Sequence, residues 1–381
     1  MVDLYDVAVV GGSSSGLIAA REAARKGLST VLFEEDAIIG RPEKCAGLYS
    51  IQGIKSLGIP VDGPYLQNRV RGAVFVSPTG RTFEVDARKD VAVVFNRERM
   101  DLYIAEQAIK AGARLFVNSH VNDVRTDGEI ATVKTSYNMV QSRYLIIAEG
   151  RTASNAKKIF PDYSTGKWLP IVQYQVTGHG MDPRFVYLFF RHYLREFFGY
   201  LVPVDNETGK FGVAASKFPD KYAEKLLSEV LPKARVTGMT SSSIYVGHPL
   251  RKIRRQNVML VGDVAGQVKA TTGGGVVMGG IAAQAAASHA AGMAIYENDV
   301  KPMIDELEGI YWVRKLYEKL SPKLIEPLFQ AIAETGFNEV LNRLGDMDRH
   351  WATFSRTLLT PVLFRTALST IKNMMNPSAY V

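Results

Sequence analysis

Cysteine is nearly absent from this sequence: Cys45 is the single cysteine in 381 residues. One thiol can neither build a disulfide framework within the chain nor supply all ligands of an all-cysteine iron–sulfur cluster. Such low cysteine usage fits a reducing compartment, so we expect a cytoplasmic protein. The first residues also lack the basic start and apolar run of a secretory signal peptide, which agrees with that expectation.

Other features are missing as well. The six histidines are scattered without metal-ligand spacing, so no metal site is predicted. The net charge of +8 is spread along the chain without interleaved aromatic residues, so nucleic-acid binding is not predicted. The stretch 270–296 has no charged residue, but it is rich in Gly and Ala and contains Gln284 and His289. It therefore predicts a buried, closely packed helix and not a membrane span.

The N-terminal residues have a complete strand–loop–helix–strand pattern. An apolar run at 6–10 leads into the glycine-rich loop 11–16, then a helical pattern at 17–26 and a second apolar run at 30–33, which Glu34 follows directly. Small residues let the backbone approach a pyrophosphate, and the free N–H groups of the helix start attract its charge. A carboxylate at the tip of the second strand accepts ribose hydroxyls. The pattern predicts dinucleotide binding, with Ser13 in place of the second glycine of G-x-G-x-x-G.

A second glycine-rich segment lies about 250 residues further along the chain. An apolar run at 258–261 ends in Gly262 and Asp263, and the glycines 273–275 open the next helical pattern. The aspartate can hold a ribityl hydroxyl, and the glycine amides can face a phosphate or a flavin carbonyl. A nicotinamide dehydrogenase needs one strand–helix–strand unit, whereas the longer FAD needs a site for each half. The two segments together therefore predict FAD.

The remaining sequence divides into strand-rich and helix-rich regions. A helical pattern at 97–111, with Leu102, Ala105 and Ile109 on one face, separates two groups of predicted strands. Residues 165–245 are rich in strand patterns, with one short helix. Beyond residue 301 the pattern is helical, and prolines are predicted to break it at positions 302, 322, 327 and 361.

These patterns predict an α/β fold with three parts. The first is a Rossmann-like FAD-binding domain, made of residues 1–65, 87–160 and 246–300. The second is an inserted antiparallel β-sheet substrate domain, made of residues 66–86 and 161–245. The third is a C-terminal helical region, residues 301–381. A chain of this length with 46% hydrophobic residues is long enough for two or three cores.

Three further segments carry a family resemblance. Residues 40–47 are similar to a G-x-P-x-x-C-G segment with Ala46 in place of the glycine, and residues 95–101 are similar to R-x-x-F-D. Residues 148–150 resemble an A-D-G motif with Glu149 in place of the aspartate. With them, residues 3–300 resemble the FAD-dependent group that includes p-hydroxybenzoate hydroxylase, flavin halogenases and geranylgeranyl reductases. The first segment resembles the geranylgeranyl reductases in particular.

The resemblance implies a set of FAD contacts from both halves of the chain. In this group the arginine that corresponds to Arg97 meets the FAD pyrophosphate. The residues expected at the cofactor are Gly11, Gly12, Ser13, Ser15, Gly16, Glu34, Glu35, Arg41, Cys45, Ala46, Arg97, Val121, Glu149, Gly150, Gly262, Asp263, Gly273, Gly274 and Gly275.

The resemblance also implies where the substrate lies. The segment Phe198-Gly-Tyr200-Leu-Val-Pro203 looks like the Y-x-W-x-F-P element of the reductases, which lines their substrate cavity. We therefore expect Phe198, Tyr200 and Pro203 at the substrate. The W-x-W-x-I-P element of the halogenases has no tryptophan counterpart here, so a halogenase is disfavoured. Cys45 lies in a segment that is beside the flavin in the reductases, either as proton donor or as a packing residue.

The function implied by the resemblance is FAD-dependent reduction of isoprenoid C=C bonds in geranylgeranyl lipids of the archaeal type. Reduced flavin passes a hydride to one alkene carbon, and Cys45 or a water molecule protonates the other. Two alternatives stay open: a flavin monooxygenase that hydroxylates an aromatic substrate, and an electron-transfer flavoprotein dehydrogenase. The reductant also stays open among ferredoxin, NAD(P)H and other donors.

The end of the chain is basic and amphipathic. After Asp348 there is no acidic residue, while Arg349, Arg356, Arg365 and Lys372 alternate with apolar runs. Such a segment can lie on an anionic bilayer as a peripheral contact. It can equally cap an apolar cavity or pack on the body of the protein.

Overall fold

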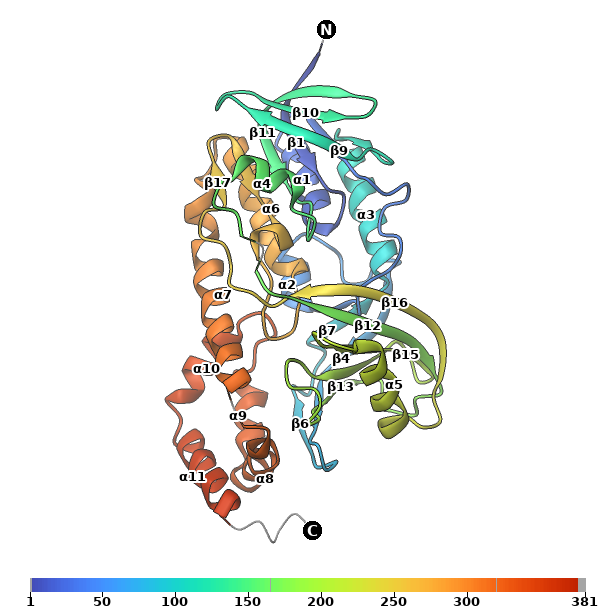
Figure 1. Cartoon of the computed structure of the whole chain (residues 1–381), viewed down its shortest axis with the longest axis vertical. Helices are drawn as coiled ribbons and strands as arrows, with labels where there is room; N and C mark the ends of the chain where they lie inside the picture. The colour runs from blue at the N-terminus through green and yellow to red at the C-terminus, as the bar shows by residue number, and fades with distance from the viewer. Residues whose placement is uncertain (1, 165, 320, 376–381) are drawn as a thin grey trace.

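The sheet at the N-terminal end of the molecule carries the predicted nucleotide-binding pattern (Figure 1). The computed structural model describes residues 2–164, 166–319 and 321–375. The main strand order is β17-β18-β11-β1-β2-β8, and β11 also pairs with β10, which pairs with β9. The strands are β1 (Asp3–Val10), β2 (Thr30–Phe33), β8 (Arg114–Phe116), β9 (Val121–Thr126), β10 (Ala131–Thr135), β11 (Met139–Ile147), β17 (Arg254–Arg255) and β18 (Val258–Leu260).

The central strands of this sheet run parallel, as the Rossmann-like prediction requires. β1 lies between β11 and β2, and the outer neighbours β18 and β8 continue the parallel direction. Parallel strands end at the same edge of a sheet, so the loops that follow β1 and β18 lie at one edge. Strands β9 and β10 form an antiparallel addition that the sequence patterns did not indicate.

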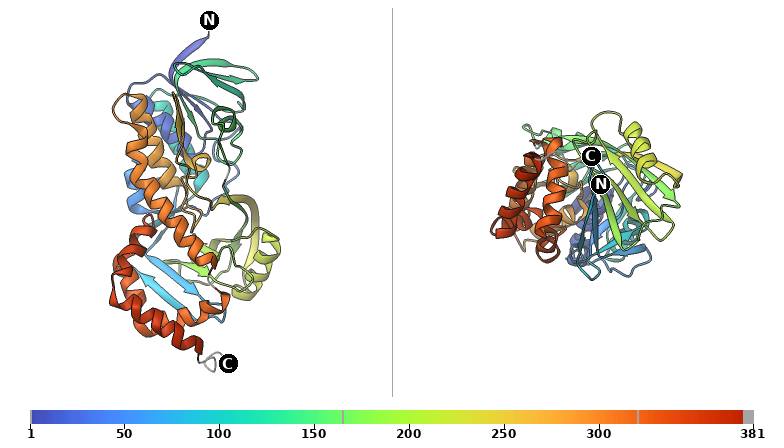
Figure 2. Two further views of the ribbon diagram at one scale, coloured as in Figure 1. Left: turned by 60° about the vertical axis from the view of Figure 1, so that its left-hand side comes forward. Right: turned by 90° about the horizontal axis from the view of Figure 1, so that it is seen from below.

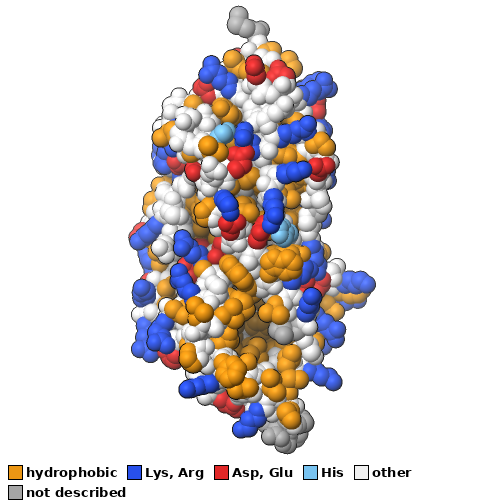
Figure 3. All heavy atoms as spheres, turned by 90° about the vertical axis from the view of Figure 1, so that its left-hand side faces the viewer, with side chains coloured by type: hydrophobic (Ala, Val, Ile, Leu, Met, Phe, Trp, Pro, Cys, Tyr) orange, Lys and Arg blue, Asp and Glu red, His pale blue; other side chains and the backbone are white. Residues whose placement is uncertain are grey.

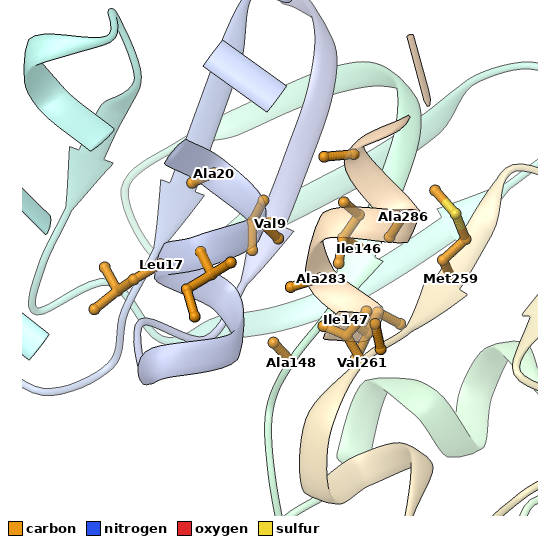
Figure 4. Packing of buried hydrophobic residues seen from close by; sticks show 14 of the residues in the cluster. Val9, Leu17, Ala20, Ile146, Ile147, Ala148, Met259, Val261, Ala283 and Ala286 are labelled. Carbon is orange, nitrogen blue, oxygen red and sulfur yellow. The ribbon is translucent and has the colours of Figure 1, made fainter. Parts of the chain in front are cut away.

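Helices α1 (Ser14–Arg25) and α6 (Val276–Ala290) pack against this sheet (Figure 4). Side chains from both helices and from the strands interdigitate, and small residues on α6 permit the close approach. A Cβ atom added to Gly279 on α6 would lie 2.3 Å from Ser15 Oγ on α1. The prediction of a buried helix in the stretch 270–296 is confirmed. Among the described residues, every helix is too short or too polar to cross a bilayer.

A second sheet has the order β16-β12-β15-β14-β13-β5-β6. Its pairs are antiparallel except for β13 with β5, which run parallel. The inserted sheet is thus confirmed, with one parallel pair. Its strands are β5 (Gly72–Val76), β6 (Thr82–Asp86), β12 (Trp168–Thr177), β13 (Phe185–Phe189), β14 (Gly199–Pro203), β15 (Thr208–Ala214) and β16 (Arg235–Tyr245). Helix α5 (Pro219–Val230) contacts β12 and β15.

A third, three-stranded sheet has the order β3-β7-β4. Its strands are β3 (Leu48–Ser50), β4 (Leu66–Val70) and β7 (Ala92–Phe95), and the helices near it are α2 (Ile51–Ser56) and α3 (Arg97–Lys110). Residues 66–70 therefore pair outside the inserted sheet, and the domain boundaries stay a prediction. The predicted face of α3 is wrong, because Leu102 is 37% and Ile109 is 56% exposed. The side chains of Met100, Ile104 and Ala108 are buried instead, together with the predicted Ala105.

Helices make up the C-terminal region, as predicted. They are α7 (Tyr296–Lys319), the short 3-10 helix η2 (Pro322–Leu324), α8 (Ile325–Thr335), α9 (Phe337–Leu344), α10 (His350–Leu358) and α11 (Pro361–Met375). The predicted breaks at Pro302 and Pro327 are wrong, because Pro302 lies inside α7 and Pro327 lies in the first turn of α8. A proline inside a helix can remove one hydrogen bond but need not end the helix. Helices α8 and α9 contact β6 of the second sheet (Figure 2). The predicted region extends to residue 381, and residues 376–381 lie outside the described part.

Candidate active site

The loop after β1 needs glycine at several positions, because a side chain there would collide with neighbouring atoms. A Cβ atom on Gly16 would lie 1.9 Å from the carbonyl oxygen of Gly11, and one on Gly12 would lie 2.8 Å from Cβ of Glu34. Gly11 itself has φ of +102°, a conformation that side chains disfavour. The Gly12 N–H donates to Oε2 of Glu34 at 2.5 Å. The loop and the acidic strand tip are thus in direct contact, while the predicted contact of Glu34 with a ribose stays a prediction.

A cavity of about 210 Å³ lies beside this loop. It gathers many of the residues expected at the cofactor, namely Gly11, Gly12, Ser13, Glu34, Glu35, Val121, Glu149 and Gly150. The Glu149 carboxylate accepts from the backbone N–H groups of Asn155 (2.9 Å) and Ala156 (2.7 Å), so it caps helix α4 (Ser154–Ile159). Arg41 does not line this cavity; its Nε donates to Glu98 at 2.5 Å. Direct contacts of Glu149 and Arg41 with the cofactor stay predictions.

Arg97 places a positive charge against the glycine loop. Its Nη2 donates to Ser13 Oγ at 2.9 Å, and its Nε donates to Oδ2 of Asp101 at 2.8 Å. The Ser14 hydroxyl donates to the other Asp101 oxygen at 2.5 Å. Burial raises the pKa of Asp101, while the guanidinium and these hydrogen bonds act in the opposite direction. A fixed guanidinium beside free backbone N–H groups suits the two charges of a pyrophosphate.

The second glycine segment lies directly against the first. The 3-10 helix η1 (Gly262–Ala265) follows β18, and a Cβ atom on Gly262 would lie 2.8 Å from Ser15 Oγ. A Cβ atom on Gly275 would lie 2.9 Å from Oδ1 of Asp263. The fold therefore brings together two segments that are about 250 residues apart in sequence.

Within this second segment, the carboxylate of Asp263 lacks hydrogen-bond partners among the described residues. Burial raises the pKa of its carboxyl, and the charge of Arg97 acts in the opposite direction. Asp263 is half-buried, and a partly desolvated carboxylate without a partner is favoured when a ligand supplies a hydrogen-bond donor. A ribityl hydroxyl is such a donor, so the glycine loop, the guanidinium and Asp263 together fit FAD.

Comparison with known proteins agrees with this geometry. Residues 6–149 match the family of FAD dependent oxidoreductases. This chain is an FAD-dependent oxidoreductase. The matched residues contain the glycine loop, Glu34 and Arg97, whereas Gly262 and Asp263 lie beyond them and are placed by the fold.

The curated relatives of this oxidoreductase extend over most of its length. Digeranylgeranylglycerophospholipid reductase 1 of Methanosphaera stadtmanae is 28% identical over 340 residues, which cover 85% of this chain and 82% of the relative. Digeranylgeranylglycerophospholipid reductase of Methanocaldococcus jannaschii is 26% identical, over 87% of this chain and 92% of the relative. The resemblance to geranylgeranyl reductases is thereby confirmed.

Solved structures support the fold assignment. A geranylgeranyl bacteriochlorophyll reductase-like protein from Thermoplasma acidophilum superimposes with a TM-score of 0.79 at 21% identity, covering 96% of this chain and 99% of that one. The p-nitrophenol 4-monooxygenase of Pseudomonas putida superimposes with a TM-score of 0.69 at 14% identity, covering 96% of this chain and 99% of that one. The fold is therefore shared by reductases and monooxygenases and does not by itself separate them.

Cys45 is linked to the second sheet through Gln173. The backbone carbonyl of Cys45 accepts from Gln173 Nε2 at 3.5 Å, and Gln173 Oε1 accepts from the Tyr200 hydroxyl at 2.9 Å. The half-buried Cys45 Sγ lies 3.6 Å from the Tyr49 hydroxyl. Burial raises the pKa of both tyrosines, so they are neutral near pH 7. Tyr49 and Gln173 were missed from the sequence, because nothing in their local pattern marks them.

The other two residues predicted at the substrate lie near this link. Phe198 is half-buried and belongs to the apolar cluster that contains Tyr200. Pro203 is buried at the end of β14, and its carbonyl accepts from Asn68 Nδ2 at 2.9 Å. The three residues thus share one strand segment, and their contact with a substrate stays a prediction.

A buried ion pair also joins the two larger parts of the site. Lys210 Nζ on β15 donates to Oε1 of Glu43 at 2.7 Å, and the same oxygen accepts from the Arg97 backbone N–H at 2.7 Å. The exposed fractions of the two side chains are only 4% for Lys210 and 13% for Glu43. The sequence does mark Lys210 as a candidate for a buried charge, since it is a lone charged residue at the start of an apolar strand. Its partner lies 167 residues away and could not be predicted.

Proposed function

We propose that this oxidoreductase reduces isolated C=C bonds in the isoprenoid chains of geranylgeranyl lipids. The observation that carries the proposal is a series of apolar side-chain contacts that leads from Ala46, beside Cys45, to an apolar cavity at the second sheet. Ala46, next to Cys45, shares an apolar cluster with Phe198. The Phe198 ring lies 6.0 Å from the ring of Phe190, which lines an apolar cavity.

This cavity has a volume of about 220 Å³ and lies between β5, β6, α7 and α8. Its walls are entirely aromatic or aliphatic: Phe75, Phe83, Phe190, Tyr317, Leu324, Ile325, Leu328, Phe329 and Ile332. On the face that shows the C-terminal helices, hydrophobic side chains surround a hollow in the lower half (Figure 3). A long hydrocarbon chain can contact all of these apolar walls, whereas a small polar aromatic substrate would contact few of them.

The chemistry requires few polar groups from the chain. Bound, reduced FAD supplies a hydride to one alkene carbon. The apolar residues hold the alkene and exclude water, and Cys45 Sγ donates a proton to the other carbon. The Tyr49 hydroxyl, 3.6 Å from that sulfur, is placed to donate a hydrogen bond to the thiolate, and solvent returns the proton to Cys45 after the product leaves. The curated relatives support this assignment of substrate class, since their names describe reductases of digeranylgeranyl lipids.

The proposal is tested by mass spectrometry of lipid products. Photoreduced holoenzyme is incubated with a digeranylgeranyl glycerophospholipid, and the products should gain two hydrogen atoms for each double bond in successive steps. Apoprotein without flavin, illuminated under the same conditions, is the control. Oxygen incorporation into an aromatic substrate, with no change in the lipid, would instead favour a monooxygenase.

Replacement of Cys45 by alanine should lower turnover with this lipid by about tenfold. General acids usually contribute about 10²–10⁴-fold, and a water molecule at the site can replace part of that contribution. The flavin absorbance spectrum and FAD affinity should stay unchanged, which separates proton donation from cofactor binding. Equal turnover of Cys45→Ala and wild type would restrict Cys45 to a packing role.

We also propose that the C-terminal helices contact an anionic membrane from which the lipid is taken. The exposed fractions of the side chains of Trp312, Leu359 and Phe364 are 62%, 86% and 67%. Trp312 lies on α7, Leu359 directly follows α10, and Phe364 lies on α11, while the exposed Arg356 and Arg365 lie on α10 and α11. Apolar side chains flanked by cations match a lipid surface with negative headgroups.

Binding to vesicles measures this contact. The protein should sediment with phosphatidylglycerol vesicles and much less with phosphatidylcholine vesicles. Arg356→Gln with Arg365→Gln should weaken binding about 30-fold, at about 1 kcal/mol for each cation. Lys134→Gln, an exposed change on β10, is the matched control. Equal binding of the double variant and wild type would contradict the electrostatic contribution.

A further inference from the structure

A cluster of polar side chains connects the second glycine segment to the C-terminal helices. Lys269 Nζ donates to Oδ1 of Asp348 at 2.8 Å and to the carbonyl of Met347 at 2.7 Å. The other Asp348 oxygen accepts from the hydroxyl of Ser50, which lies at the end of β3. Close by, Thr271 Oγ1 and His350 Nδ1 lie 2.7 Å apart. None of these residues belongs to the site predicted from the sequence.

The cluster holds one cation and one anion at neutral pH. Burial acts to raise the pKa of Asp348, but the Lys269 ammonium and the hydrogen bonds from Lys269 and Ser50 lower it overall. Burial and the same ammonium lower the pKa of His350 to about 4, so this histidine is neutral. The exposed fractions of the Lys269 and Asp348 side chains are 10% and 15%, so water screens their charges weakly.

Lys269 belongs to the loop whose glycines are expected at the flavin ring. Its backbone N–H donates to the carbonyl of Gly274 at 3.1 Å, and its carbonyl accepts from the N–H of Gly273 at 2.8 Å. Its side chain runs along Gly274, because a Cβ atom there would lie 3.0 Å from Lys269 Cε. The ammonium position is therefore fixed at both ends, by the loop backbone and by Asp348.

We propose that Lys269 and Asp348 form a positioning pair that sets the charge beside the flavin and thereby its reduction potential. This inference rests on FAD binding and deepens the proposed function. A flavin gains negative charge on reduction, so a nearby cation favours the reduced form and a nearby anion opposes it. In the pair these effects partly cancel, and each residue also holds the other in place. The C-terminal helical region thus supplies a residue, Asp348, to the flavin site.

The midpoint potential of the holoenzyme tests the pair, because the two single variants should shift it in opposite directions. Lys269→Met removes the cation and should lower the potential, whereas Asp348→Asn leaves the cation without its partner and should raise it. Each shift should correspond to about a tenfold change in the ratio of affinities for reduced and oxidised FAD, which is about 30 mV for a two-electron couple. The double variant should lie close to the wild-type potential.

Controls separate this electrostatic role from a structural one. Lys301→Met and Asp305→Asn remove an exposed ion pair on α7, and neither should move the potential. If Lys269→Met does not fold, Lys269→Arg takes its place as a test. This variant keeps the positive charge and should therefore keep the wild-type potential. Unchanged potentials, or single-variant shifts of the same sign, in proteins that still bind FAD would overturn the pair. Opposite shifts in an enzyme that does not reduce the lipid would support the pair and contradict the proposed substrate.

Discussion

Replacement of Arg97 by methionine should weaken FAD binding by about a hundredfold or more. The guanidinium is held beside the glycine loop by Ser13 and Asp101, at 2.9 Å and 2.8 Å. Removing a buried charge from a paired ionic contact commonly weakens binding by about 2–5 kcal/mol, and each 1.4 kcal/mol is tenfold. The variant would also leave the buried Asp101 carboxylate without its cation. Fluorescence titration of the apoprotein with FAD measures the effect.

Arg99 provides the matched control for this prediction. It lies on the same helix, α3, but its side chain points to solvent. Arg99→Met should therefore leave FAD affinity unchanged. Arg97→Lys should restore only part of the affinity, because an ammonium lacks the planar set of donors that a pyrophosphate engages. If Arg97→Met bound FAD as tightly as Arg99→Met, Arg97 would have no role at the pyrophosphate.

Replacement of Lys210 by methionine should destabilise the folded protein by about 3–5 kcal/mol, the usual effect of removing one partner of a buried ion pair. The Glu43 carboxylate would then be buried with only the Arg97 N–H as a donor. Because Glu43 and Arg97 are in contact, FAD affinity should fall as well. Chemical denaturation of the apoprotein measures the loss of stability without the contribution of bound FAD.

A double variant distinguishes the unpaired charge from the loss of packing. Lys210→Met combined with Glu43→Gln removes both charges and should recover more than half of the lost stability, since the pair itself contributes little net free energy. Lys217→Met, at an exposed position after β15, is the control for replacing a lysine near this strand. A double variant less stable than Lys210→Met would show that the carboxylate is not the origin of the effect.

Local patterns predicted the cofactor half of this site well. The apolar run predicted at 30–33 has the same bounds as β2. The helix predicted at 17–26 ends one residue after α1 and begins three residues after its start. Such patterns succeed where the elements are buried and their ends carry glycine or an acidic tip. The buried face of α3 was predicted wrongly, because two overlapping sets of apolar residues in this helix have the same spacing. Only tertiary packing selects Met100, Ile104 and Ala108 as the buried set.

Contacts between distant residues were not predictable from one sequence. Strand β16, with its Thr and Ser residues and its mixture of exposed and half-buried side chains, lacks apolar alternation and is held by backbone pairing with β12. The bond between Ser50 and Asp348 joins positions 298 residues apart. No local pattern marks either residue, so the contact between strand β3 and the segment that joins α9 to α10 emerges only from the fold.

The parallel pairing of β13 with β5 has a consequence for how this chain can be divided. Residues 72–86 are made early in synthesis, yet they occupy one end of a sheet whose other strands begin at residue 168. A fragment of residues 161–245 would leave the whole edge of β13 unpaired, and such edges recruit other strands and aggregate. The two larger sheets are therefore interleaved along the chain, and neither can be inherited, exchanged or expressed as a separate module.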